Sequence, residues 1–181
     1  SLVILFSKGE KECWALLGKC KFIWTQLPDF LRPTLKPDSS EELGFVEMTS
    51  RIKAFASTES AGIGENATCV IADELEWHPC ATQNFMQVKP TIDGVGQVIG
   101  LSTVDKRRPN TLLKNLFKAA YYDNSNGFTP LFFPYDVRPG RDEEWYEFTK
   151  ANVPVDELGG LTPDLYMQQN YPRSVEEALS P

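Results

Sequence analysis

The sequence predicts an α/β domain with a largely parallel β-sheet flanked by helices, because apolar strand-like runs alternate with helix-like stretches. Three short apolar runs carry this prediction: 2–7 (LVILFS), 68–73 (TCVIAD) and 96–103 (GQVIGLST). Continuous apolar runs of this length are typical of strands that are buried on both faces of a parallel sheet. We therefore expect all three runs to lie in one sheet.

The segment after the first run has the pattern of a helix followed by a loop. Apolar residues recur at the i, i+3, i+4, i+7 spacing of one helix face from Cys13 to Leu27, and Pro28 is predicted to end that helix. The stretch 27–40 contains three prolines, so we expect a loop there.

Shorter elements complete the chain. Pro109 stands near the start of an amphipathic stretch, and acidic residues in the first turn of 141–152 suit the positive end of a helix dipole. The predicted elements are two short strands within 43–57 around Thr49-Ser50, a glycine loop at 61–67, helices at about 79–88, 109–122 and 141–152, a strand at 129–135, and short helices at 162–170 and 174–179. The predicted core aromatics on these helices are Phe117, Trp145, Tyr146 and Phe148.

The composition is that of an ordinary globular domain. Of the 181 residues, 41% are hydrophobic and 24% are charged, which is enough for one domain with a sizeable core. The net charge of −7 argues against a surface that coats nucleic acid, because affinity for a phosphate backbone needs clustered Lys and Arg. A localised DNA contact stays open.

The sequence contains four cysteines: Cys13, Cys20, Cys69 and Cys80. They form no CxxC pair and have no ligand-like spacing with the single histidine, His78, so we interpret them as reduced, mostly buried thiols of a cytosolic protein. No apolar run approaches the roughly 20 residues that span a bilayer, and no signal-peptide pattern is present. The chain begins with Ser1 directly in a strand-like run, as a piece of a longer protein would.

Two adjacent carboxylates, Asp73 and Glu74, follow directly after the apolar run Cys69-Val70-Ile71-Ala72. Burying carboxylates is costly unless they are paired or bind a metal. In parallel α/β sheets, functional residues gather where the strands end. Asp73 is therefore a candidate ligand of Mg²⁺, and Glu74 is a candidate base that orients or deprotonates an attacking water, as in the Walker B strand of nucleotide hydrolases. The alternative is a strand that ends in two solvated acids.

Two hydroxyl groups, those of Ser102 and Thr103, follow the next predicted strand. If the two strands are neighbours, the hydroxyls lie beside the carboxylates and could contact the γ-phosphate of a nucleotide or its attacking water. The alternative is a pair of hydroxyls that caps a turn.

Two other features have simpler interpretations. His78-Pro79 indicates a helix boundary, because a single histidine without an obvious partner makes no catalytic triad. Lys106-Arg107-Arg108 could touch a DNA phosphate, but a short run of charges is more simply a solvated loop.

Five segments, taken in order, resemble the ATPase domain of the large terminase subunit of tailed double-stranded DNA phages, the motor that packs DNA into capsids. The resemblance runs nearly from end to end. It implies a P-loop NTPase-like fold of the ASCE type, incomplete at its N-terminal side, in which 1–181 form a single domain and about 141–181 its closing segment. The segments are LVILFSKGEKECWALLGKCKFIWTQLPDFLRP, RIKAFASTESAGIGENATCVIADELEWHP, PTIDGVGQVIGLSTVDKR, FFPYDVRPGRDEEWYE and QQNYPRSVEEALSP.

The resemblance also implies function. Asp73 and Glu74 match the family's Walker B carboxylates, and Ser102-Thr103 match its coupling motif. The complete subunit would use ATP and Mg²⁺ to translocate viral DNA and would also carry a nuclease. The implied partners are double-stranded DNA, a portal protein, a small terminase subunit and further copies in a homo-oligomeric ring in the host cytoplasm, with no membrane.

The chain departs from the family pattern in two ways. It contains no G-x-x-x-x-G-K-[ST] phosphate loop, and Gly18-Lys19 lies inside the amphipathic helix, so the family's Walker A motif would precede Ser1 and its nuclease would follow Pro181. Ile63 stands where many relatives carry an arginine. Three arginines are possible substitutes, although a solvated surface role is simpler for each: Arg51, Arg107 and Arg108.

Two alternatives stay open. One is a non-catalytic prophage remnant or truncated domain that folds and binds partners. The other is a different DNA-dependent ATPase of the same fold, such as a helicase, which would need a second motor domain or helicase motifs.

Overall fold

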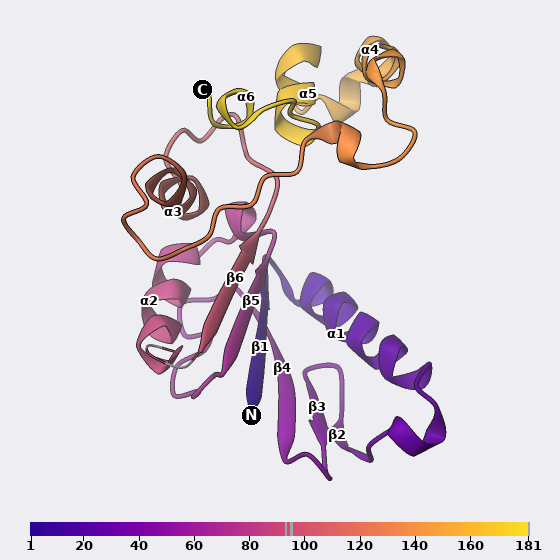
Figure 1. Ribbon diagram of the computed structural model, residues 1–181, viewed down its shortest axis with the longest axis vertical. Helices are drawn as coiled ribbons and strands as arrows, with labels where there is room; N and C mark the ends of the chain where they lie inside the picture. Colours follow the sequence, from indigo (N-terminus) through magenta and orange to yellow (C-terminus); the bar gives the residue numbers. More distant parts are fainter. Residues whose placement is uncertain (93, 95, 181) are drawn as a thin grey trace. The chain divides into compact units, whose positions relative to one another are not determined.

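The computed structural model of the protein describes residues 1–92, 94 and 96–180. It divides into two compact units, Ser1–Ser102 and Thr103–Pro181. The first unit contains a β-sheet with helices, and the described part of the second consists of helices and loops (Figure 1). Among the described residues, no helix is both long and apolar enough to cross a membrane.

The described residues of the first unit form a six-stranded sheet in the order β2-β3-β4-β1-β5-β6. Strands β4, β1, β5 and β6 are parallel, and β2 and β3 add an antiparallel hairpin at one edge. The predicted largely parallel sheet is confirmed, and the three predicted apolar strands lie side by side as β1, β5 and β6. The strands are β1 (Leu2–Ser7), β2 (Leu35–Asp38), β3 (Glu42–Phe45), β4 (Ser50–Ala56), β5 (Cys69–Asp73) and β6 (Gln97–Leu101).

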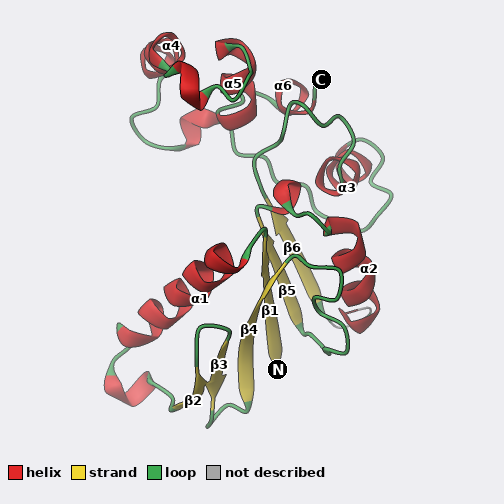
Figure 2. Ribbon diagram, turned by 180° about the vertical axis from the view of Figure 1, so that it is seen from behind, coloured by secondary structure: helices red, strands yellow, loops and turns green. Residues whose placement is uncertain are grey.

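Helices α1 (Glu10–Thr25) and α2 (Ala81–Ile92) lie on opposite faces of this sheet (Figures 1 and 2). Successive strand residues point to opposite faces, so neighbours on β1 serve different helices. Leu5 belongs to the cluster that packs against Cys13 and Leu17 of α1. Phe6 lies on the other face, where both it and Val88 of α2 lie against Gly62.

The limits of both helices follow from their sequences with one adjustment. Helix α1 ends before Pro28, as predicted. Helix α2 begins at Ala81 and continues to Ile92, with Pro90 inside its last turn, so it starts and ends later than the predicted 79–88.

The proline-rich stretch 27–40 is more ordered than predicted. It contains a 3-10 helix, η1 (Asp29–Leu31), and the edge strand β2, so the predicted loop is wrong there. Strand β2 tolerates Pro37 because an edge strand pairs on one side only and can leave one residue without an N–H. The predicted pair of strands around Thr49-Ser50 is confirmed as β3 and β4, with Thr49 in the left-handed region at φ 48°.

All four cysteines are free thiols. Cys13 is buried, and the other three are partly buried. Burial raises the pKa of the Cys13 thiol to about 11, so this side chain is a neutral core residue at physiological pH.

The second unit contains the helices that the sequence predicts. Each begins after a residue whose side-chain oxygen accepts a hydrogen bond from the backbone of the first turn, which satisfies an otherwise unpaired N–H. The helices and their capping residues are α3 (Leu112–Tyr121, Thr111), α4 (Glu143–Asn152, Asp142), α5 (Pro163–Asn170, Thr162) and α6 (Val175–Leu179, Ser174).

Two predictions for this unit are wrong. Residues 129–134 form no strand, and Tyr135 begins a 3-10 helix, η3 (Tyr135–Val137). Pro130 and Pro134 have no N–H to donate, and the described part of the unit offers no strand for pairing. Phe148 is 68% exposed, whereas Tyr146 is buried, because positions two apart on a helix point in nearly opposite directions.

Candidate functional site

The predicted carboxylates and the first predicted hydroxyl lie at the same edge of the sheet. Asp73 is the last residue of β5 and lies opposite Leu101, the last residue of the parallel strand β6. Ser102 follows Leu101 directly, so the pairing of the two strands brings it to the edge that carries Asp73 and Glu74. The expectation that these strands are neighbours, with their polar residues at one edge, is confirmed for Ser102.

Glu74 turns the chain sharply out of the sheet. Its backbone is left-handed, with φ 55° and ψ 41°, and it precedes the 3-10 helix η2 (Leu75–Trp77). This conformation costs a residue other than glycine about 1–2 kcal/mol. A hydrogen bond from the Trp77 N–H to the Glu74 carbonyl, 2.8 Å long, helps to hold it. The sequence carried no signal for this turn, because Glu is not a residue that favours the left-handed region.

His78 fixes the same turn from the other side. Its ring is 5% exposed, and Nε2 lies 2.8 Å from the carbonyl oxygen of Asp73. A carbonyl can only accept, so Nε2 carries the proton and donates it. Burial lowers the pKa of His78, against the opposing effect of its bond to Asp73 and the nearby carboxylates, and favours the neutral ring. The predicted boundary role is confirmed, since His78 follows η2, and the contact with Asp73 is additional.

The side chain of Glu74 contacts Lys8, which the sequence analysis missed. Lys8 Nζ lies 2.7 Å from Glu74 Oε2, and the two side chains are 41% and 44% exposed. Oε2 itself is covered and makes no hydrogen bond of good geometry, so the contact is an ion pair. Contact with Glu74 raises the pKa of Lys8. The available signal was that Lys8 directly follows β1, the other neighbour of β5.

The two predicted hydroxyls differ in what surrounds them. Ser102 Oγ is buried and, among the described residues, has no hydrogen-bond partner. A buried hydroxyl without a partner is unfavourable, so this atom is placed to bond to something that enters the site. Thr103 is the next residue in the chain and the first of the second unit.

The glycine loop before β5 is a packing feature. Gly62 has φ 85°, and a Cβ there would lie 2.9 Å from both Phe6 and Val88. Asn84 of α2 holds the loop by donating to the carbonyls of Thr58 (2.6 Å) and Ala61 (3.4 Å). The close approach to the core explains Gly62 without a phosphate.

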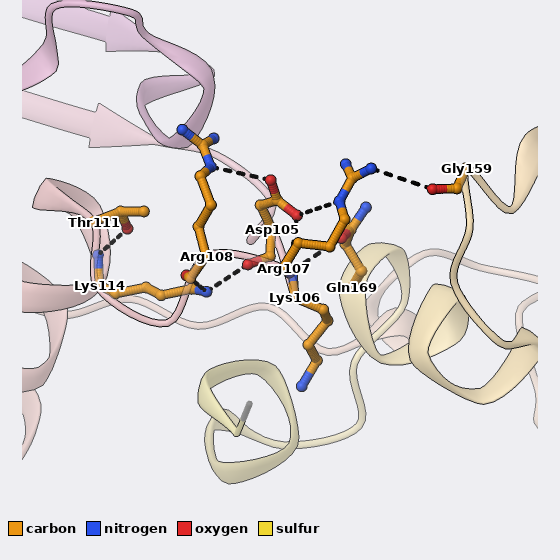
Figure 3. A network of polar contacts seen from close by, with 8 residues as sticks. All are labelled: Asp105, Lys106, Arg107, Arg108, Thr111, Lys114, Gly159 and Gln169. Atoms are coloured by element: carbon orange, nitrogen blue, oxygen red, sulfur yellow. Dashed lines mark hydrogen bonds and ion pairs between the residues drawn. The ribbon is translucent and has the colours of Figure 1, made fainter.

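A polar network in the second unit, here called the Asp105 cluster, comprises Asp105, Lys106, Arg107, Arg108 and Lys114 (Figure 3). The Asp105 carboxylate accepts bonds of 3.0 Å from Nε of Arg107 and from Nε of Arg108. Burial alone would raise the pKa of Asp105, but the bonds from Arg107 and Arg108 outweigh it and lower the pKa. Lys114 Nζ donates to the backbone carbonyls of Asp105 (2.6 Å) and Arg108 (2.5 Å).

Lys106 departs from the predicted solvated loop. It is 6% exposed, and its ammonium donates to the carbonyls of Glu177 and Ser180 at the end of α6. Burial lowers its pKa. The prediction is therefore wrong for Lys106, whereas the side chains of Arg107 and Arg108 are 52% and 43% exposed.

The three candidate arginines all have acidic partners. Arg107 and Arg108 pair with Asp105, and Arg51 Nη1 lies 3.4 Å from Glu42 Oε1. The geometry therefore singles out none of them as a replacement for the arginine that Ile63 displaces.

Similar solved structures are large terminases of phages or their ATPase domains. The chain is similar to the large terminase ATPase domain of Thermus phage P74-26, with a TM-score of 0.67 and 17% identity over 94% of this chain and 75% of that one. For the large terminase of bacteriophage HK97 the values are 0.61, 13%, 78% and 30%. For the large terminase of a thermophilic bacteriophage, solved in complex with ADP, they are 0.55, 13%, 87% and 39%.

These similarities show the fold. The mixed α/β architecture expected from the resemblance is confirmed, and the chain spans less than half of the HK97 protein and of the ADP-bound terminase. No protein-family profile and no curated protein sequence matches the chain.

The neutral His78 predicts a dependence of stability on pH. As the pH falls below about 6.5, the unfolded chain takes up a proton on this histidine that the folded chain resists, so the free energy of unfolding falls. The chain has one histidine, so His78→Gln removes this contribution. Urea unfolding from pH 7.5 to pH 5 should show the stability advantage of the wild type over the variant shrinking. An advantage that stays constant across this range would contradict a buried neutral His78.

The Asp105 cluster predicts a local stability effect. Asp105→Asn keeps the shape of the side chain but removes the charge that holds two arginines, so we expect a loss of about 1–3 kcal/mol in the free energy of unfolding. Urea unfolding followed by circular dichroism measures it. Asp123→Asn, at an exposed position in the same unit, is the matched control and should change stability by less than about 0.5 kcal/mol. Equal losses in the two variants would contradict the role of the cluster.

Proposed function

We propose that the chain is part of an ATP-hydrolysing motor that translocates double-stranded viral DNA into a capsid. ATP is hydrolysed at the sheet edge formed by Asp73, Glu74 and Ser102. The observation that carries this proposal is the parallel pairing of β5 with β6, which brings both carboxylates and a buried, unpartnered hydroxyl to one edge. The fold shared with phage large terminases supports it.

Asp73 fits the role of a Mg²⁺ ligand. Protein sites for Mg²⁺ use one or two carboxylates and complete the coordination with water and substrate phosphates. The edge offers carboxylates of this kind, and the described residues contain no group of three or more His, Cys, Asp or Glu that would form an all-protein metal cage. Mg²⁺ bound there would neutralise negative charge on the β- and γ-phosphates of ATP.

Glu74 fits the role of the base. It lies one residue beyond Asp73 on a backbone that turns away from the strand, so its carboxylate is not tied to the alternation of the sheet. It accepts a proton from the attacking water, or orients that water toward the γ-phosphate. Ser102 and Thr103 then contact the γ-phosphate or the water and report hydrolysis to the rest of the subunit.

The exposed edge of the sheet supports a need for further chain. Strand β6 pairs with β5 on one side, and no described strand covers its other side. Ile99 and Leu101 are 40% and 45% exposed, which is unusual for apolar residues of a parallel strand. In a complete subunit, we place the phosphate-binding loop and its strand beside β6. The isolated 181-residue chain should then bind Mg-ATP weakly and hydrolyse it near the background rate.

The partners follow from the same proposal. Double-stranded DNA is the substrate that is moved, and a portal protein, a small terminase subunit and further copies of the subunit in a ring complete the motor. The net charge of −7 restricts DNA contact to a small local surface of this chain.

The two carboxylates should respond differently to substitution in a complete subunit that contains this chain. Glu74→Gln keeps the size of the side chain but removes the base, so ATP binding persists while hydrolysis falls by roughly 10²–10⁴-fold. Asp73→Asn weakens the Mg²⁺-dependent part of ATP binding, because the metal bridges the phosphates. Calorimetry with Mg-ATP and a phosphate-release assay separate the two effects.

The exposed Glu59 provides the control for this experiment, and Glu59→Gln should behave as the wild type in both assays. Unchanged hydrolysis in Glu74→Gln would overturn the proposed role of Glu74.

Thr103→Val should impair coupling more than nucleotide binding. Most of the binding affinity comes from the phosphate loop, whereas a hydroxyl at the end of β6 senses the γ-phosphate. We expect DNA packaging to fall sharply while ATP affinity changes little, and Thr103→Ser, which keeps the hydroxyl, to preserve packaging. If affinity and packaging fall together in the valine variant, the coupling role is wrong.

A further inference from the structure

The backbone of Glu74 is fixed, but its side chain is not. The Trp77 N–H bonds to the Glu74 carbonyl, and the His78 ring bonds to the carbonyl of the preceding Asp73. The left-handed turn is thus held on both sides. The position of the carboxylate is decided by rotation of the side chain and by the group that it contacts.

That group is Lys8. It directly follows β1, and Phe6 of β1 lies opposite Ala72 of β5, so both strands end at the same edge. Lys8 Nζ lies 2.7 Å from Glu74 Oε2. Both side chains are more than a third exposed, and an exposed ion pair is weak enough to break easily.

An ammonium ion in contact with a carboxylate hinders its work as a base. The lone pairs that would accept a proton from water are drawn toward the positive charge, and the carboxylate is turned toward β1. We propose that Lys8 is a positioning residue that holds Glu74 in a resting position, so that hydrolysis begins only after Glu74 leaves Lys8. This inference rests on the proposed function, which assigns Glu74 the role of base.

The test is the rate of the hydrolysis step in a single turnover, measured without DNA on a complete subunit that contains this chain. Lys8→Met removes the charge and keeps the length of the side chain, so we expect the hydrolysis step to accelerate about two- to five-fold, the range that loss of an exposed ion pair allows. The ATP concentration at half-maximal rate should not change. Lys8→Arg restores a cation and should return the rate to that of the wild type.

Two further variants sharpen the result. Lys19→Met, at an exposed lysine of α1, is the matched control and should leave the rate unchanged. Lys8→Met combined with Glu74→Gln should be as slow as Glu74→Gln alone, because the gain requires the base. A slower or unchanged hydrolysis step in Lys8→Met overturns the inference.

The failure of this inference can be told from the failure of the proposed function. If Glu74→Gln hydrolyses ATP as fast as the wild type, the proposed function fails. If Glu74→Gln is slow but Lys8→Met is not faster, only the role of Lys8 fails.

A second measurement needs no activity. The Lys8 amine should react more readily with acetic anhydride in Glu74→Gln than in the wild type, because loss of the ion pair frees the amine. Mass spectrometry of the peptide that contains Lys8 measures this, with the Lys19 peptide as internal reference. Equal labelling of Lys8 in the two proteins would show that the ion pair does not form in solution.

Discussion

The pairing of β5 with β1 on one side and with β6 on the other is the constraint on which the candidate site depends. Parallel strands in register end at the same edge, so residues far apart in the sequence meet there: Lys8 after β1, Asp73 and Glu74 at β5, and Ser102 after β6. A slip of one residue would turn every side chain of a strand to the other face. The buried Ile4 and Val70, directly opposite each other, fix this register.

The carboxylates can serve chemistry because a rigid sheet carries an irregular turn. The strand delivers Asp73 to the edge, and the left-handed Glu74 takes the chain out of the sheet at once. His78 reaches back to the carbonyl of Asp73 and holds that turn from within the core. Local strain at such a point is stable only when several contacts oppose its relaxation, and hydrogen bonds from Trp77 and His78 do so here.

Much of the sheet could be predicted because its strands are apolar enough to identify themselves. The runs at 2–7 and 68–73 needed no tertiary information, and the polar residues at the ends of β5 and β6 followed from the geometry of parallel sheets. The pairing of Lys8 with Glu74 could not be predicted, because it depends on the spatial order of the strands. In the second unit, the buried Lys106 looked like a surface residue, because its acceptors are backbone carbonyls more than seventy residues away in the chain.

The most direct test of the account is a structure of a complete subunit that contains this chain, bound to Mg²⁺ and a non-hydrolysable ATP analogue. The account predicts the γ-phosphate at the sheet edge between Glu74 and Ser102, with the metal on the side of Asp73 and a further strand paired with β6. A nucleotide bound elsewhere in the subunit, with Asp73 and Glu74 exposed to solvent, would contradict it.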